Sequence, residues 1–294
     1  MELVIRNLSK QYSKSVWGLR NLDLAAGPGV LGLLGPNGAG KSTLMRILAT
    51  ITKPTAGTVT WDGVDIVRSP DAIREVLGYL PQDFGVYPNL NAVEFLEYLA
   101  GIKGLERRSA RRRIDDLLSS VNLVDVRKRP LGTYSGGMKQ RIGIAQALLN
   151  DPKILIVDEP TVGLDPEERI NFRNLLTDLS GDRIVILSTH IVSDVEAAAG
   201  RIAIVNSGQL LRECAPEELL AEVRDCVWEW MVSSAELETV RRQYRVSNAI
   251  RRPDGVEVRA IAQRPPSPSA RRVDPALEDA YLHVISARRA EAIA

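Results

Sequence analysis

A glycine-rich stretch near the start of the chain, VLGLLGPNGAGKSTLMRIL at residues 30–48, constrains the fold more than any other segment. An apolar run typical of a buried strand breaks into Gly35, Gly38 and Gly40, and helix-forming residues follow directly after Lys41. A glycine costs about 0.5–1 kcal/mol of extra backbone entropy at an ordered position. The cluster therefore predicts a tight turn between a strand and a helix, in which the backbone itself touches a large bound group.

The spacing of these residues fits the phosphate-binding pattern G-x-x-x-x-G-K-[ST]. In such a loop, backbone N–H groups surround a phosphate chain, and the following helix adds its partially positive N-terminus. Side chains would block that approach, which predicts the glycines. Lys41 is expected to reach the β- and γ-phosphates, and the Ser42 hydroxyl to ligate Mg²⁺. The alternative, a fortuitous glycine turn, is disfavoured by the flanking strand and helix. The predicted nucleotide-binding residues of this loop are Gly35, Pro36, Asn37, Gly38, Ala39, Gly40, Lys41, Ser42 and Thr43.

A second segment, ILIVDEP, supplies two carboxylates at the end of an apolar run. Asp158 is expected to hold Mg²⁺ through a water molecule, and Glu159 to orient and deprotonate the attacking water. Taken alone, this pattern is often no more than a solvated strand end. Together with the glycine loop, it predicts a site that hydrolyses a nucleoside triphosphate.

Length and composition limit the other possibilities. The chain has 294 residues, enough for a large domain plus a small one, and its formal net charge of +1 gives no reason to expect a nucleic-acid partner. Cys214 and Cys226 lack metal-ligand or disulfide spacing and suit a reducing compartment. The start MELVIRNLSK does not resemble a secretory signal, and no run approaches the roughly 18 apolar residues of a spanning helix. We expect neither a signal nor a membrane span.

Hydrophobic patterning predicts the order of the elements. Strands are expected at residues 3–8, 22–29 and 57–63, a helical region from residue 70 to about 150, and a strand pair near residues 201–211. Within the helical region, Asn91 with Glu94 three residues later predicts a capping box at the start of a helix. KILIVDEP and RIVILSTH at residues 153–160 and 183–190 read as strands buried on both faces of a parallel sheet, with a helix between them. After residue 225, VWEWMV, VEVRAIA and a final helix ALEDAYLHVISARRA predict a small α+β unit.

The segment TYSGGMKQRIGIAQALL at residues 133–149 places Ser135, Gly136 and Gly137 at the start of a helix, which makes a second phosphate-binding end. With the glycine loop and ILIVDEP, this segment resembles the signature loop of ABC transporter ATP-binding subunits. The resemblance covers residues 1 to about 224. The common form LSGGQ is replaced here by YSGGM, which is similar to the drug and antibiotic export subset.

The resemblance implies an α/β fold with a P-loop NTPase (RecA-like) core, an N-terminal antiparallel β subdomain and an α-helical insertion at about 83–150. It implies an ATP-binding cassette at residues 1–224 and a small C-terminal accessory or regulatory domain at residues 225–294. The ending PALEDAYLHVI resembles the terminus of drug-export ATPases, whereas the preceding segment matches poorly.

The family also implies roles for further residues. Two subunits pair head to tail, so that Ser135, Gly136 and Gly137 of one cover the γ-phosphate held by Lys41 of the other. Tyr12 matches the aromatic residue that stacks on adenine, with Trp17 as a competitor and a structural role as the alternative. Further matches are Gln82, the glutamine that touches Mg²⁺, and residues 163–165, the loop that crosses the dimer interface; Asp165 also suits a helix N-cap.

One of the two histidines, His190, ends an apolar strand at the edge where Asp158 and Glu159 end theirs. The family resemblance implies that His190 hydrogen-bonds the γ-phosphate and positions the water, although a lone histidine is more often structural. His283, on the final helix, is assigned a structural role.

The implied function is that of an ATPase that powers a separate integral-membrane permease, with ATP and Mg²⁺ bound between two copies of the chain. Its location would be peripheral, on the cytoplasmic face of the membrane. The cargo is expected to be a drug or another hydrophobic or amphipathic compound, with lipid, polysaccharide or small peptide as alternatives. Other possibilities are a non-transport ABC-type ATPase, a regulator that binds ATP without turnover, and a P-loop kinase, which would leave the signature helix unexplained.

Overall fold

The computed structural model describes residues 1–291, and its internal contacts divide the chain into two compact units, Met1–Leu210 and Leu211–Ala294. The sequence analysis instead places the boundary at residues 224 and 225. Because the glycine loop, the ILIVDEP segment, the signature segment and His190 all precede residue 210, the candidate site belongs to the first unit alone.

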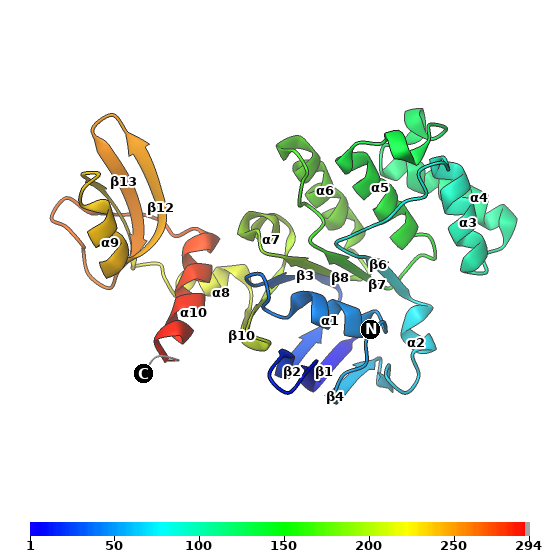
Figure 1. Cartoon of the computed structure of the whole chain (residues 1–294), viewed down its shortest axis with the longest axis horizontal. Coiled ribbons are helices and arrows are strands. Elements are labelled where there is room, and N and C mark those ends of the chain that lie inside the picture. The colour runs from blue at the N-terminus through cyan, green and yellow to red at the C-terminus, as the bar shows by residue number, and fades with distance from the viewer. Residues whose placement is uncertain (292–294) are drawn as a thin grey trace. The chain divides into compact units, whose positions relative to one another are not determined.

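A six-stranded sheet forms the centre of the first unit, and its edge strand at residues 209–214 continues past the boundary at residue 210 (Figure 1). Strands β7 and β8 are buried along their whole length, as expected for strands covered on both faces. The neighbouring pairs from β9 to β6 are all parallel. In spatial order the strands are β10 (Gln209–Cys214), β9 (Arg201–Asn206), β3 (Gly29–Leu34), β8 (Ile184–Thr189), β7 (Ile154–Asp158) and β6 (Leu77–Leu80).

A second, antiparallel sheet packs against the first through helix α1 (Lys41–Leu48). Leu44, Met45 and Leu48 of α1 belong to one buried apolar cluster with residues of both sheets. Figure 1 shows α1 between the two sheets, while α6 (Pro166–Leu179) and α7 (Val192–Ala198) cover the opposite face of the six-stranded sheet. The antiparallel sheet has the order β2 (Trp17–Ala26), β1 (Leu3–Gln11), β4 (Ala56–Trp61) and β5 (Val64–Asp65).

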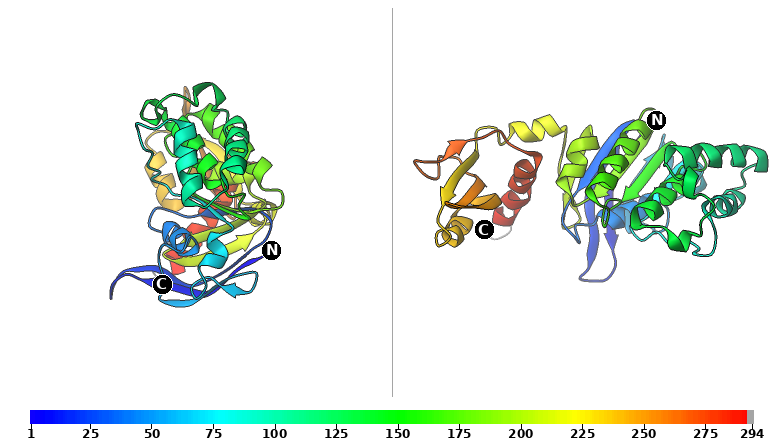
Figure 2. Two further views of the ribbon diagram at one scale, coloured as in Figure 1. Left: turned by 90° about the vertical axis from the view of Figure 1, so that its right-hand side faces the viewer. Right: turned by 90° about the horizontal axis from the view of Figure 1, so that it is seen from above.

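The helical insertion follows strand β6 and lies beside that edge of the sheet (Figure 2). It contains α3 (Ala92–Ile102), α4 (Arg107–Ser120), two short 3₁₀ turns at Val124–Val126 and Leu131–Thr133, and α5 (Gly136–Ala147). Asn91 and Glu94 form the predicted capping box at the start of α3. The capping box fixes where the insertion's first helix begins.

The expectation of helix from residue 70 onward is wrong for its first part. Helix α2 (Asp71–Arg74) is a single turn, and β6 then adds an edge strand to the six-stranded sheet. A four-residue strand is too short to show a period of two against a helical background. The all-helical part therefore begins only after β6.

The second unit is an antiparallel sheet with helices. Strands β11 and β13 and the terminal helix were expected, whereas β12 and α9, which share a polar, arginine-rich sequence, were not. Trp230 packs edge-to-face against Tyr244 in its core. Its elements are α8 (Pro216–Ala221), β11 (Val227–Val232), α9 (Leu237–Gln243), β12 (Arg245–Arg252), β13 (Gly255–Ile261), β14 (Arg271–Arg272) and α10 (Leu277–Glu291).

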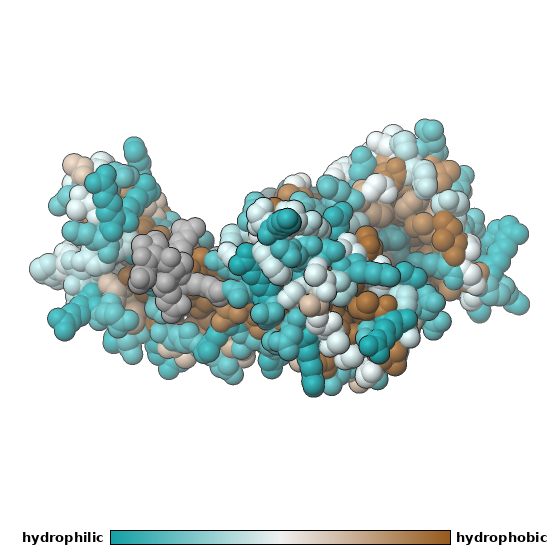
Figure 3. Space-filling model, turned by 60° about the horizontal axis from the view of Figure 1, so that its bottom comes forward, coloured by the Kyte–Doolittle hydropathy of each residue, from teal (hydrophilic) through white to brown (hydrophobic). Residues whose placement is uncertain are grey.

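One face of the molecule is mainly hydrophilic (Figure 3). Figure 3 shows that separate hydrophobic areas interrupt the hydrophilic residues on this face. Within residues 1–291, no helix combines the length and the apolar character needed to cross a bilayer.

Candidate functional site

Four parallel strands end at the same edge of the central sheet and carry the candidate site. In the strand register, Leu34 of β3 lies beside Thr189 of β8, and Asp158 of β7 lies beside Ser188 of β8. Leu80 of β6 lies beside Val157 of β7. The loops that follow these strands therefore leave from one edge, which is where ligands bind in parallel α/β sheets.

These loops surround a cavity of about 580 Å³. It joins the glycine loop to Gln82, Glu159 and His190, as the sequence predicts, whereas Ser135, Gly136 and Gly137 are not among its lining residues. The chain thus brings together one half of the predicted site. Its lining residues are Tyr12, Val16, Trp17, Gly18, Asn37, Gly38, Ala39, Gly40, Lys41, Ser42, Thr43, Gln82, Glu159, Val162 and His190.

Two glycines of the loop are required by the chain's own packing, in addition to any bound group. A Cβ on Gly40 would lie 2.3 Å from the Gly18 carbonyl oxygen, and Gly40 has φ +106°. A Cβ on Gly35 would lie 2.3 Å from the Val205 carbonyl oxygen. Only Gly38, with φ +78° and no atom within 4 Å of such a Cβ, faces open space. The glycines are predicted to let a bound phosphate approach the backbone, and packing within the chain is a second reason for Gly35 and Gly40.

Lys41, Glu159 and His190 form a connected polar group. Lys41 Nζ lies 3.2 Å from Glu159 Oε1, and His190 Nδ1 lies 2.8 Å from Glu159 Oε2. Lys41 Nζ also donates a hydrogen bond to the Gly35 carbonyl oxygen at 2.7 Å. Glu159 is only 6% exposed, so these partners hold its carboxylate in one place.

The backbone of Glu159 is strained. Its φ is +49°, in the left-handed region that residues other than glycine, asparagine and aspartate seldom adopt. The Glu159 N–H donates to the Ser188 carbonyl oxygen at 2.8 Å, which fixes this conformation against the neighbouring strand. Such conformations cost about 1–3 kcal/mol and cluster at functional sites.

Asp158 has the environment of a metal-binding carboxylate. It is 2% exposed, and its Oδ1 has no hydrogen-bond partner. Burial is the main cause that raises the pKa of Asp158, and the nearby Glu159 charge adds to it, whereas the Ser188 and Ser42 hydroxyls and Lys41 act in the opposite direction. A buried carboxylate oxygen without a partner, near a serine hydroxyl, fits Mg²⁺, which prefers oxygen ligands.

The expected adenine end of the cavity holds two aromatic rings. Tyr12 and Trp17 both line it and both are exposed. The Tyr12 hydroxyl lies 3.3 Å from Thr43 Oγ1, and the Arg20 guanidinium lies over the Trp17 ring. Both rings are therefore placed where a base can stack on them.

The signature turn is exposed at the start of α5. Ser135 is the N-cap, and its hydroxyl accepts a hydrogen bond from the Met138 N–H at 3.2 Å. The variable residue Tyr134 is buried and donates to the Val126 carbonyl oxygen at 2.9 Å, so it anchors the turn to the insertion. Ser135 and Gly136 are therefore exposed at the surface, outside the cavity of the same chain, whereas Gly137 is buried.

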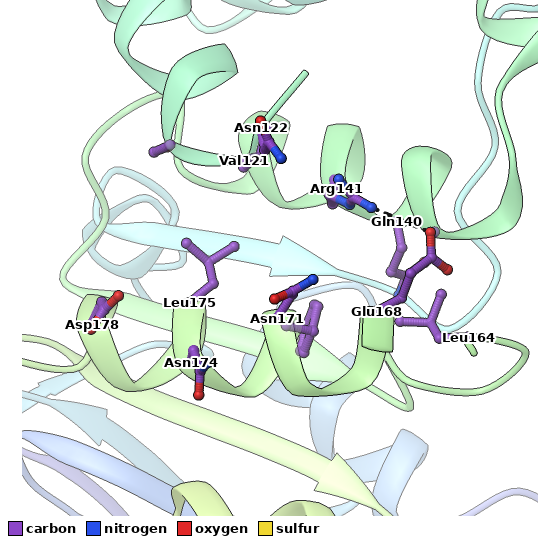
Figure 4. Close-up of a pocket in the computed structure, with 13 residues that line it drawn as sticks. Val121, Asn122, Gln140, Arg141, Leu164, Glu168, Asn171, Asn174, Leu175 and Asp178 are labelled. Atoms are coloured by element: carbon purple, nitrogen blue, oxygen red, sulfur yellow. Dashed lines mark hydrogen bonds and ion pairs between the residues drawn. The ribbon is translucent and has the colours of Figure 1, made fainter. Parts of the chain in front are cut away.

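A smaller cavity of about 250 Å³ separates α5 from α6 (Figure 4). At one end, the Glu168 carboxylate lies where a Cβ of Gly137 would be, and it pairs with Arg141 at 3.3 Å. The loop at residues 163–165 leads directly into α6, whose N-cap is Asp165, as predicted. Gly137 is therefore required for the contact between α5 and α6.

Sequence reasoning missed two buried polar residues behind the site. Thr161 and Asp194 are each 1% exposed, and the Thr161 hydroxyl donates to the Asp194 carboxylate. They lie 33 positions apart in the sequence. A threonine after DEP and an aspartate on a short helix carry no pattern by themselves, so only the fold reveals the pair.

Comparison with known proteins agrees with this architecture. The model of the ABC transporter family matches residues 19–162. The chain is 36% identical to "ABC transporter ATP-binding protein NatA" of Bacillus subtilis, covering 72% of this chain and 87% of that protein. It is 38% identical to "Daunorubicin resistance ATP-binding protein DrrA3" of Streptomyces coeruleorubidus, covering 69% of this chain and 65% of that protein.

Solved structures give the same result. A dimeric bacterial ABC transporter cassette, MJ0796, is 28% identical, with a TM-score of 0.66 over 72% of this chain and 98% of that one. The same values hold for MJ0796 in a dimeric post-hydrolysis state bound to ADP and Pi. These likenesses confirm the predicted resemblance and fold class. The chain belongs to the ABC transporter family and is one of its ATP-binding, ATP-hydrolysing subunits.

Proposed function

We propose that this chain works as a head-to-tail homodimer that binds and hydrolyses two ATP molecules and thereby drives an exporter. The observation that carries the proposal is the division of the site. One cavity unites the glycine loop, Gln82, Glu159 and His190, while the signature turn is exposed elsewhere on the same chain. A second copy is the partner that this division requires.

In this proposal, the glycine loop binds the triphosphate through backbone N–H groups and the start of α1. Mg²⁺, held by Ser42, Gln82 and Asp158, would neutralise charge on the phosphates. Lys41 exchanges its contacts with Glu159 and Gly35 for the β- and γ-phosphates.

Release of Lys41 leaves the Glu159 carboxylate free to accept a proton from the attacking water. His190, whose ring lies 2.8 Å from Glu159, orients that water and donates to the γ-phosphate. Ser135 and the amides of Gly136 and Gly137 from the second copy complete the charge stabilisation. Closure of the dimer is thus favoured while the γ-phosphate is present, and hydrolysis reverses it.

The proposal includes a separate integral-membrane permease that docks on the helical insertion, with the protein on the cytoplasmic face of the membrane. Exposed aromatic residues support this: Tyr87 and Tyr98 stand at the surface of the insertion and meet edge-to-face at 5.6 Å. For the cargo, the name of the relative DrrA3 concerns daunorubicin resistance. It supports a drug or another hydrophobic or amphipathic compound. The C-terminal part is proposed to be accessory or regulatory.

The test compares purified wild type with Glu159→Gln and Lys41→Ala. Glu159→Gln should keep ATP binding, lose at least about a hundredfold in kcat and accumulate as an ATP-bound dimer, because the base is removed and the neutral amide cannot accept the proton. Lys41→Ala should weaken ATP binding itself. ATP affinity, phosphate release and size-exclusion chromatography with light scattering measure the three effects.

Two results would contradict the proposal. Hydrolysis near the wild-type rate by Glu159→Gln would exclude the catalytic role of that carboxylate. A protein that turns over ATP as a monomer at every concentration would exclude the shared site.

A further inference from the structure

The feature that carries a further inference is the buried pair of Thr161 and Asp194. The Thr161 hydroxyl donates a hydrogen bond to Asp194 Oδ2 at 2.5 Å. Both residues are 1% exposed. Because a buried carboxylate is costly unless it is paired, the position of Thr161 is strongly specified by Asp194.

The pair connects the two segments that carry the reacting side chains. Thr161 follows Glu159 by two residues on the segment after β7, and Asp194 follows His190 by four residues on the segment after β8. The last backbone hydrogen bond of the sheet between these two segments runs from the Glu159 N–H to the Ser188 carbonyl oxygen. Beyond that point the backbones of both segments leave the sheet, and the Thr161–Asp194 bond holds them together.

Arginines of α6 hold both ends of this connection. Arg169 Nε donates to the Thr161 carbonyl oxygen at 3.3 Å. Arg173 Nη1 donates to the Ser193 carbonyl oxygen at 3.2 Å and lies 3.9 Å from Asp194 Oδ1. Since α6 begins at the end of the loop at residues 163–165, the connection is continuous with that loop.

We propose that Thr161 and Asp194 are positioning residues that hold the Glu159 carboxylate and the His190 ring in the register needed for hydrolysis. The proposal deepens the ATPase function proposed above and rests on it. The Glu159–His190 contact of 2.8 Å depends on the spacing of two loops, and the buried bond fixes that spacing through two residues that do not line the cavity. Misplacing a catalytic group by about 1 Å can cost roughly a hundredfold in rate.

The first test uses Thr161→Val and Thr161→Ser in the full-length protein. Valine keeps the shape but removes the donor, whereas serine keeps the hydroxyl. At saturating Mg-ATP, Thr161→Val should lose roughly tenfold to a hundredfold in kcat with KM within about twofold of wild type. Thr161→Ser should recover most of the rate. Equal kcat values for Thr161→Val and wild type, or a serine variant as impaired as the valine variant, would overturn the proposal.

A second test reads the geometry without turnover. The chain has only two histidines, His190 and His283, and they lie in different units. Imidazole NMR signals of the nucleotide-free protein should therefore give one probe beside the site and one internal control. Thr161→Val should shift the His190 signals as Glu159→Gln does, while Thr161→Ser and the His283 signals stay at their wild-type positions.

The two readouts separate the possible failures. Wild-type protein without ATPase activity would contradict the proposed function, yet the NMR comparison would still test the connection. Unchanged His190 signals in Thr161→Val would overturn the positioning role even if kcat fell. Should the valine variant fail to fold, Thr161→Ala, which also removes the donor, replaces it with the same expected results.

Discussion

At the scale of single residues, the buried carboxylate of Asp158 suits a bound Mg²⁺ but destabilises the folded protein when no ion is bound. Burial raises its pKa above the usual value of 3.8. At pH values between the pKa of Asp158 in the unfolded chain and its higher pKa in the folded protein, the folded state binds more protons than the unfolded state. Stability therefore falls as the pH rises through this interval, and at neutral pH the fold retains an uncompensated charge.

We predict that Asp158→Asn raises the stability of the nucleotide-free protein and abolishes Mg²⁺-dependent turnover. Each 1 kcal/mol gained should raise Tm by about 2–4 °C. The gain should become smaller as the pH is lowered from 7 through the raised pKa of the wild-type carboxyl, because protonation neutralises that carboxyl. Thermal unfolding over a series of pH values and ATPase assays measure these effects. A variant less stable than wild type at pH 7 would contradict the account.

At the scale of elements, the helical insertion is attached to the central sheet by close backbone contact. Gly78 lies in β6, and a Cβ there would approach the carbonyl oxygen of Ala147, the last residue of α5, to 2.2 Å. A backbone atom cannot move aside as a flexible side chain can. The signature helix therefore depends on the absence of one methyl group in the edge strand.

Gly78→Ala should consequently destabilise the protein by roughly 1–3 kcal/mol, the usual cost of overpacking. The matched control is Gly101→Ala in α3, where a Cβ meets no atom within 4 Å. Alanine is the better helix former, so this control should be neutral or more stable by up to about 1 kcal/mol. Urea unfolding of both variants gives the comparison, and equal effects would refute the packing argument.

At the scale of the whole molecule, each unit has its own core and its own polar anchor. In the second unit, Asp279 at the start of α10 is 1% exposed and accepts hydrogen bonds from Arg259 of β13, the shortest at 2.8 Å. Arg259 also donates to Glu229 of β11 at 3.0 Å. The ALEDAY segment thus contains the residue that ties the last helix to the sheet.

We predict that Asp279→Ala destabilises the unit Leu211–Ala294 by about 1.5–3 kcal/mol, because Arg259 loses one of its two carboxylate partners and keeps Glu229. ATP binding, which depends on the other unit, should persist. Urea unfolding followed by the fluorescence of Trp228 and Trp230 in a Trp17→Phe/Trp61→Phe background reports on the second unit, and a nucleotide-binding assay of the variant with all four tryptophans reports on the first. Asp254→Ala, at the exposed β12–β13 turn, is the control and should change neither.

How well the sequence predicts a structural feature depends on how far apart in the chain the interacting residues lie. The capping box of Asn91 and Glu94 is local, and the sequence predicts it correctly. The apolar run of β7 is also a local pattern, and the sequence predicts it. The four-residue strand β6 is too short to show such a pattern, and the sequence does not predict it. Contacts such as Thr161 with Asp194 join positions far apart in the chain. They depend on strand order, which no local pattern contains.

The left-handed backbone of Glu159 has a consequence for sequence selection. In a library screened only for resistance to proteolysis, aspartate at position 159 should be enriched over the native glutamate, since it adopts a positive φ more readily and keeps a carboxylate for the buried Lys41. A screen for growth that depends on ATP turnover should restore glutamate. The position at which these two screens disagree most would then identify the hydrolytic carboxylate without any assay of the purified protein.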